Sequence, residues 1–238
     1  MRNVMTIASR EFVSYFTSPM AYVAMLFVLG LCGLIYVLTT SSMMPPKADM
    51  AGMFHSMVFL TLIAAPVVTM GLLAQETNSG TYELLMTKPV RDVEVVVGKY
   101  LGAVGLFLVI LIVSLEFPLI YGIFGKPDWG QTLSGYIGLL LCGLAFLAVG
   151  VFSSSLTSNQ IAAWLIGTSI LLLFWLIGWL SMGGSTWLGG VVKGLSVYEN
   201  FGDFERGVVD AKNLLYFISV CVFFLFLTVR SLESRRTV

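Results

Sequence analysis

The sequence predicts an all-α protein that crosses a membrane six times. Of its 238 residues, 58% are hydrophobic and 11% are charged, and the mean hydropathy is +0.93. A soluble domain carries about 25% charged residues, so this chain has too few charges to cover a surface that faces water. Six apolar runs, each close to the roughly 20 residues that a spanning helix needs, give the number of crossings: residues 20–40, 56–74, 101–121, 136–154, 161–182 and 214–229.

The apolar runs are expected to be helices, because hydrocarbon cannot hydrogen-bond to exposed backbone groups. None of them alternates apolar and polar residues as a lipid-facing barrel strand does. All six lack Lys and Arg, and only the third contains a carboxylate, that of Glu116. The runs use about half of the chain, which leaves no continuous stretch for a separate soluble domain of about 100 residues. We therefore expect a single domain over residues 1–238.

A helix that lies along the membrane surface is predicted before the first crossing. Residues 2–16 place apolar side chains at steps of three and four, which is typical of an interfacial amphipathic helix. Ser18-Pro19 then ends the helix. The apolar stripe consists of Val4, Ile7, Ala8, Phe12, Tyr15 and Phe16, and the polar residues that lie mostly off it are Arg2, Asn3, Arg10 and Glu11.

A second amphipathic helix is predicted between the fifth and sixth runs. Residues 195–209 follow a glycine-rich turn and carry large apolar side chains at helical spacing. We expect this segment to lie on the outer surface of the membrane or to re-enter it. Its apolar positions are Leu195, Tyr198, Phe201, Phe204 and Val208.

The positive charges predict that both termini are cytoplasmic. With the N-terminus inside, the inner segments carry eight Lys and Arg residues and the outer segments carry five. Three of those five lie in one long outer loop, where positive charge has less influence on orientation. The excess on the inner side therefore sets the orientation.

The residues that common catalytic sites need are missing from the sequence. His55 is the only histidine, which excludes zinc-protease spacing. The phosphate-binding pattern G-x-x-x-x-G-K-[ST] is absent, so we expect no bound cofactor and no ATP hydrolysis by this chain. Zero net charge leaves no basic excess for nucleic acid. The three cysteines show no metal-binding spacing and are expected to be packing residues.

The most specific pattern lies in the polar loop predicted after the second run, residues 75–100. Residues 76–90 read E-T-N-S-G-T-Y-E-L-L-M-T-K-P-V, and residues 96–101 fit V-x-G-K-x-L. Both segments resemble those of ABC-2 type transporter permeases. Gln75 stands where that family often has a second acid. Residues 195–210 are similar to the branch associated with bacterial gliding motility and, more distantly, to the permease accessory to nitrous-oxide reductase maturation.

The resemblance implies a six-helix permease subunit in the bacterial cytoplasmic membrane. It also implies a homodimer or a heterodimer with a sister permease, and a separate cytoplasmic ABC ATPase that binds the ATP. Membrane lipid would surround the subunit. An outer partner could contact residues 195–210.

The resemblance also implies a coupling segment that contacts the ATPase, formed by a short helix from Thr77 to Met86. In this interpretation Glu76 and Glu83 pair with basic residues of the ATPase, and Pro89 ends the helix. The alternative is a solvated loop anchored to lipid by a few apolar residues. The residues assigned to coupling are Glu76, Gly80, Thr81, Glu83, Leu84, Leu85 and Lys88.

The sequence contains three further patterns that are less specific for function than the coupling segment. Glu116 could line a path for a polar substrate or a proton, but we favour a structural role near the outer interface. Gly98-x-x-x-Gly102 would permit a close approach of two helices. The outer Met-rich segment could offer soft ligands to Cu(I), but Met is common at membrane boundaries, and we expect no metal; its members are Met43, Met44, Met50, Met53, His55 and Met57.

The sequence therefore favours a permease subunit that couples ATP hydrolysis by a partner to export or to mechanical transmission. The alternative is a membrane scaffold that holds a complex together without moving a substrate. No composition in the apolar runs points to one substrate class.

Overall fold

The computed structural model describes residues 2–42, 50–80, 91–124, 128–180 and 194–236. In these ranges the chain forms helices and turns, without strands. Six segments are long and apolar enough to cross a membrane, which confirms the predicted number and the all-α class. They are Pro19–Leu38, Met50–Asn78, Asp92–Ile123, Trp129–Leu156, Gln160–Gly178 and Ala211–Ser234.

Several of the spanning segments contain more than one helix. The first consists of α2, a π-helical turn η1 and α3, and the second and third each bend once, at Met70 and Leu115. Of the helices in the described residues, α1 before the first span and α12 before the last lie outside the spans. The bounds are α1 (Arg2–Thr17), α2 (Pro19–Met25), η1 (Leu26–Gly30), α3 (Leu31–Ser42), α4 (Met50–Thr69), α5 (Gly71–Asn78), α7 (Asp92–Ser114), α8 (Glu116–Phe124), α9 (Trp129–Leu156), α10 (Gln160–Leu180), α12 (Val197–Glu205) and α13 (Ala211–Arg236).

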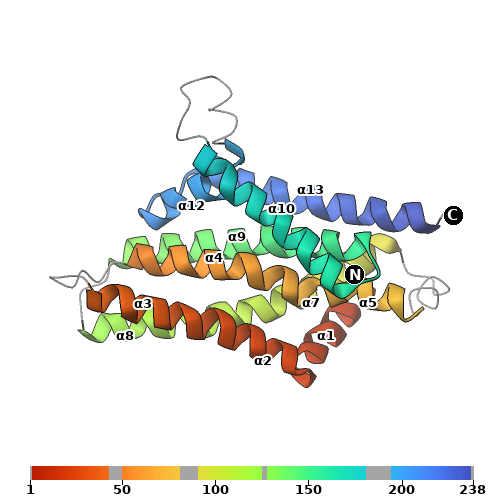
Figure 1. Ribbon diagram of the computed structural model, residues 1–238, viewed down its shortest axis with the longest axis horizontal. Coiled ribbons are helices and arrows are strands. Elements are labelled where there is room, and N and C mark those ends of the chain that lie inside the picture. The colour runs from red at the N-terminus through yellow and green to blue at the C-terminus, as the bar shows by residue number, and fades with distance from the viewer. Residues whose placement is uncertain (1, 43–49, 81–90, 125–127, 181–193, 237–238) are drawn as a thin grey trace.

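The centre of the bundle is formed by α4 and α9, which lie side by side (Figure 1). Both are largely buried, whereas fewer than a third of the residues in the spans formed by α10, α13 and the α2–α3 segment are buried. A glycine on α9 also allows α12 to pack closely against the bundle. A methyl group at Gly138 would lie 2.6 Å from the ring of Phe204, so a larger residue cannot fit there without displacing α12. The exposed apolar faces are those that lipid or a second subunit would cover.

The two ends of the bundle carry different elements (Figure 1). At one end, the α1 end, lie α1, α5 and the last turns of α13; at the other, the α12 end, lie α12 and α8. Helix α1 and the last turns of α13 thus lie at the same end of the bundle, and the side of the membrane that this end faces stays a prediction.

The predicted amphipathic helix before the last crossing is present as α12, but its buried face differs from the predicted one. Phe201 and Phe204 are buried as expected, together with Val197, whereas Leu195 and Tyr198 are exposed. Ser196 caps the helix by accepting a hydrogen bond from the backbone N–H of Glu199 at 3.3 Å. The helix therefore begins at Val197, and positions 197, 201 and 204 face the bundle. Val208, predicted on the same face, is exposed beyond the end of the helix.

Candidate functional site

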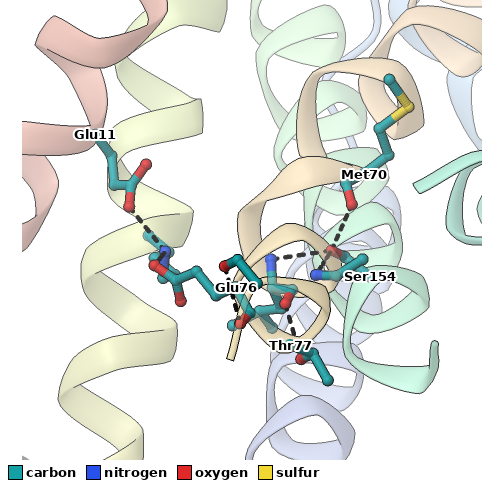
Figure 2. A network of polar contacts seen from close by, with 9 residues as sticks. Glu11, Met70, Glu76, Thr77 and Ser154 are labelled. Carbon is teal, nitrogen blue, oxygen red and sulfur yellow. Dashed lines mark hydrogen bonds and ion pairs between the residues drawn. The ribbon is translucent and has the colours of Figure 1, made fainter. Parts of the chain in front are cut away.

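A buried lysine joins three helices at the α1 end. The Lys99 ammonium of α7 lies 2.8 Å from the Glu11 carboxylate of α1 and 2.7 Å from the Glu76 carboxylate of α5 (Figure 2). The lysine side chain is 3% exposed, whereas those of Glu11 and Glu76 are 23% and 27% exposed. A buried ammonium requires a compensating charge. We call these three residues the charge triad.

Two members of the charge triad lie where the sequence did not predict them. Lys99 was predicted to lie in a loop, but α7 begins at Asp92, where Arg91 and Glu94 form the N-terminal cap with the Arg91 N–H donating to Glu94 at 3.2 Å. Lys99 is therefore in the third helical turn. Glu11 was assigned to the polar side of the first helix. The structure places it facing α7, because it follows Ile7 by one turn of the helix.

Three glycines on α7 allow α1 to approach closely. A methyl group at Gly98 would lie 2.8 Å from Cβ of Ile7, and one at Gly102 would lie 2.6 Å from Cβ of Glu11. Gly105 lies in the same way against the ring of Phe12. The close approach predicted from Gly98-x-x-x-Gly102 is confirmed. Its partner is the N-terminal amphipathic helix, which is packed on α7 rather than lying alone on the membrane surface.

The bend between α4 and α5 is closed by a hydroxyl group from α9. The Ser154 hydroxyl accepts hydrogen bonds from the N–H groups of Leu73 (3.1 Å) and Ala74 (3.0 Å), and it donates to the carbonyl of Met70 (2.8 Å; Figure 2). Hydrocarbon would leave these backbone groups without partners. Ser154 therefore fixes the direction in which α5 leaves α4.

A tyrosine from α1 forms a hydrogen bond with the last turn of α4, close to the same bend. The Tyr15 hydroxyl donates to the carbonyl of Val68 at 2.9 Å. Burial raises the pKa of Tyr15 far above its ordinary value, and the nearby Glu11 carboxylate adds to the effect. The phenol is consequently neutral, and hence a donor, throughout the physiological pH range.

The Ser154→Ala variant tests the role of this hydroxyl. We expect it to lower the free energy of unfolding by about 1–2 kcal/mol, because buried backbone groups lose a partner. Hydrogen exchange should rise at the amides of Leu73 and Ala74. The matched control is Ser155→Ala, since the Ser155 hydroxyl donates within its own helix to Phe152 at 2.7 Å. Equal exchange in the two variants would show that Ser154 does not hold the bend.

An open cavity of about 570 Å³ lies beside the charge triad. Most of its lining comes from α1, α5 and α7, and it also includes Met20 of α2, Val68 of α4 and Gln160 of α10. Two cationic and two anionic side chains face it, so its wall carries no net charge. The polar residues of its wall are Arg10, Glu11, Ser14, Tyr15, Ser18, Gln75, Glu76, Ser79, Lys99 and Gln160.

The structure describes two of the residues assigned to coupling. Glu76 pairs with Lys99 inside the chain, although it was predicted to pair with the ATPase. Gly80 has a positive φ of 70°, and a methyl group there would meet nothing within 4 Å, so its backbone conformation rather than close packing requires glycine. Of the helix predicted from Thr77 to Met86, the described part is helical only at Thr77 and Asn78, where α5 ends, and residues 81–86 lie outside the described residues. The other assigned residues lie outside the described residues: Thr81, Glu83, Leu84, Leu85 and Lys88.

Two further candidates do not belong to the charge triad. Glu116 is exposed in the first turn of α8, next to the bend at Leu115. In the Met-rich segment, Met53 and Met57 are buried in the core. Met43 and Met44 lie outside the described residues. The part of the chain that is described contains no group of three or more His, Cys, Asp or Glu that could hold a metal ion.

The fold and the site together define a multi-pass helical membrane protein in which the charge triad joins three helices at one end of the bundle. A family model described as ABC-2 family transporter protein matches residues 5–235, so the chain belongs to this family. The family consists of membrane subunits of ABC transporters, which work with a separate ABC ATPase and are not themselves ATPases. No curated protein matches the sequence.

Proposed function

We propose that this chain is the permease subunit of an ABC transporter and couples ATP hydrolysis by a separate ATPase to export or to mechanical transmission. The observation that carries the proposal is the anchoring of α5. This helix leads directly into residues 81–90, the segment that resembles the coupling element of the family. It is bound to α7 and α1 through the charge triad and to α9 through Ser154.

This anchoring provides a route for force through the membrane domain. A displacement of residues 81–90 by the ATPase would move α5, and the charge triad would carry that movement to α7 and α1. ATP binding to two ATPase subunits would thereby favour one of two arrangements of the helices, as alternating access requires. Glu76 acts within the permease in this scheme, and Glu83 makes the contact with the ATPase.

The setting of the protein follows from the same resemblance and from the charge distribution. We place it in the bacterial cytoplasmic membrane, with the α1 end in the cytoplasm and α12 outside. One permease domain spans residues 1–238 and pairs with a second copy or a sister permease. The gliding-motility branch favours export or transmission to an outer partner that contacts residues 195–210. A scaffold that moves no substrate is the second candidate.

Co-purification with the ATPase tests the proposal. In the Glu83→Arg variant we expect at least a tenfold loss of bound ATPase, because a contact of opposite charges becomes repulsive. Glu199→Arg is the matched control, since Glu199 lies on α12 at the other end of the bundle and the change in charge is the same.

The outcomes separate the two functions. Equal ATPase binding by wild type and the Glu83→Arg variant would overturn the coupling assignment. ATPase binding with a turnover rate that neither the permease nor its variants alter would favour the scaffold.

A further inference from the structure

The only histidine of the sequence lies between three helices at the α12 end. The Nδ1 atom of His55 on α4 is 3.2 Å from a carboxylate oxygen of Glu205 on α12. The imidazole ring also contacts two aromatic rings, with centroid distances of 5.4 Å to Trp175 of α10 and 5.3 Å to Tyr198 of α12. The His55 side chain thus links α4 to both α10 and α12.

We propose that protonation of His55 holds α12 more firmly against α4, and that loss of the proton loosens this contact. An imidazolium carries a proton on Nδ1 and forms an ion pair with the Glu205 carboxylate. A neutral ring donates to this carboxylate only when its single proton is on Nδ1, and it then lacks the positive charge. The contact between α4 and α12 is therefore strongest when the ring is protonated. Histidine is the side chain whose ordinary titration falls between pH 5 and 8.

The exposure of the two partners suits such a contact. The side chain of His55 is 41% exposed and that of Glu205 is 17% exposed. Water can therefore exchange a proton with the imidazole, while the carboxylate is partly shielded from solvent screening. In the orientation proposed above, this end faces the outside, where the pH varies independently of the cytoplasm.

Glu205 is the acid that the structure places on His55. The sequences of α3, α9 and α10, which pack against α4, contain no charged residue, and α4 itself contains no other ionisable group. Among the described residues, Tyr198 is the other titratable group that faces the imidazole. The other charged groups described at this end are Glu116 at the start of α8; Asp128, which caps α9; Glu199, Asp203 and Arg206 at α12; and Asp210 and Lys212 at the start of α13.

Among the described residues, α12 is also held by contacts in which no histidine takes part. Gln131 of α9 donates to the backbone carbonyl of Glu205 at 2.7 Å, and Asn213 donates to the Asp203 carboxylate at 2.8 Å. Phe201 and Phe204 are buried against the bundle. These contacts keep α12 folded and attached when the histidine is neutral. The proton therefore changes how firmly one side of α12 is held, with full contact at low pH and progressive loss as the pH rises.

Hydrogen exchange of the full chain in lipid nanodiscs tests the proposal. After correction for the chemical exchange rate, the amides of residues 197–205 should be about fivefold better protected at pH 5.5 than at pH 8. The His55→Gln variant should lose this difference, and Glu205→Gln should reduce it. Glu199→Gln is the matched control, because it removes an acid from the same helix while Glu205 and the hydrogen bond between Asn213 and Asp203 stay in place, and it should keep the full difference.

Tryptophan fluorescence gives a second readout. A change in emission between pH 5.5 and 8 should be present in wild type and absent in both His55→Gln and Trp175→Phe. Wild-type protection that does not vary with pH would overturn the proposal. A variation that persists in His55→Gln would assign it to another group and would also overturn it. If His55→Gln does not fold, Glu205→Gln decides the question, because it keeps the histidine in place.

Discussion

The Lys99→Met variant is expected to lose the firm attachment of α1 and α5 to α7. Methionine keeps much of the shape of the lysine but leaves the Glu11 and Glu76 carboxylates without their common cation. Removing one partner of a buried ion pair costs about 3–5 kcal/mol. Because both carboxylates are about one quarter exposed, we expect a loss near 3 kcal/mol in the free energy of unfolding. Denaturant titration of the chain in mild detergent measures this loss.

The matched control removes all three charges at once. In the Glu11→Gln/Lys99→Met/Glu76→Gln variant no charge is left uncompensated, so most of the stability should return. Transport should nevertheless fail in both variants if the charge triad carries movement from α5 to α7. A Lys99→Met chain as stable as wild type would show that the triad does not hold the helices together.

The Gly102→Leu variant is expected to displace α1 from α7. The first carbon atom of the new side chain would lie 2.6 Å from Cβ of Glu11 and 3.3 Å from the backbone carbonyl oxygen of Ala8. Because backbone atoms of α1 stand in the way, rotation of a side chain cannot relieve the clash. We expect α1 to become sensitive to added protease and the ammonium of Lys99 to lose Glu11. Limited proteolysis followed by mass spectrometry locates the cleavage.

Gly52→Leu is the matched control for this substitution. Gly52 also lies inside a helix, but a methyl group there would meet nothing within 4 Å. The change should therefore leave the protease pattern unaltered. Cleavage of α1 at the same rate in both leucine variants would show that α1 is not held by close packing at Gly102.

Much of the architecture could be predicted from the sequence because membrane crossings are long and uniformly apolar. The six spans and both amphipathic helices required only hydropathy and helical spacing. The ends of the spans were less accurate. The third was predicted to begin at residue 101, but Asp92 already starts α7, because the cap formed by Arg91 and Glu94 precedes a stretch that hydropathy alone assigns to a loop.

The charge triad could not be predicted because its members are 88 and 23 residues apart in the chain. Hydropathy treats each charge as facing water, whereas Lys99 is compensated by groups from two other helices. One signal was available for Glu11. It lies one helical turn after Ile7 and one before Tyr15, so the apolar stripe itself predicts that it faces the same side. The ion pair of Glu76 with Lys99 could not be predicted either, and the predicted contact of Glu76 with the ATPase stays a prediction.

The packing of α1 on α7 also constrains the order of events when the protein is made. The chain is synthesised from its N-terminus, and 80 residues separate the end of α1 at Thr17 from Gly98, the first glycine of its docking surface. During insertion α1 must therefore wait until the third crossing is in place. An amphipathic helix can wait on the lipid surface, and the exposed Met5 and Val13 give it an apolar contact there. In that case α1 would lie on the membrane surface, as predicted from the sequence, while the chain is being inserted, and it would pack on α7 in the mature protein.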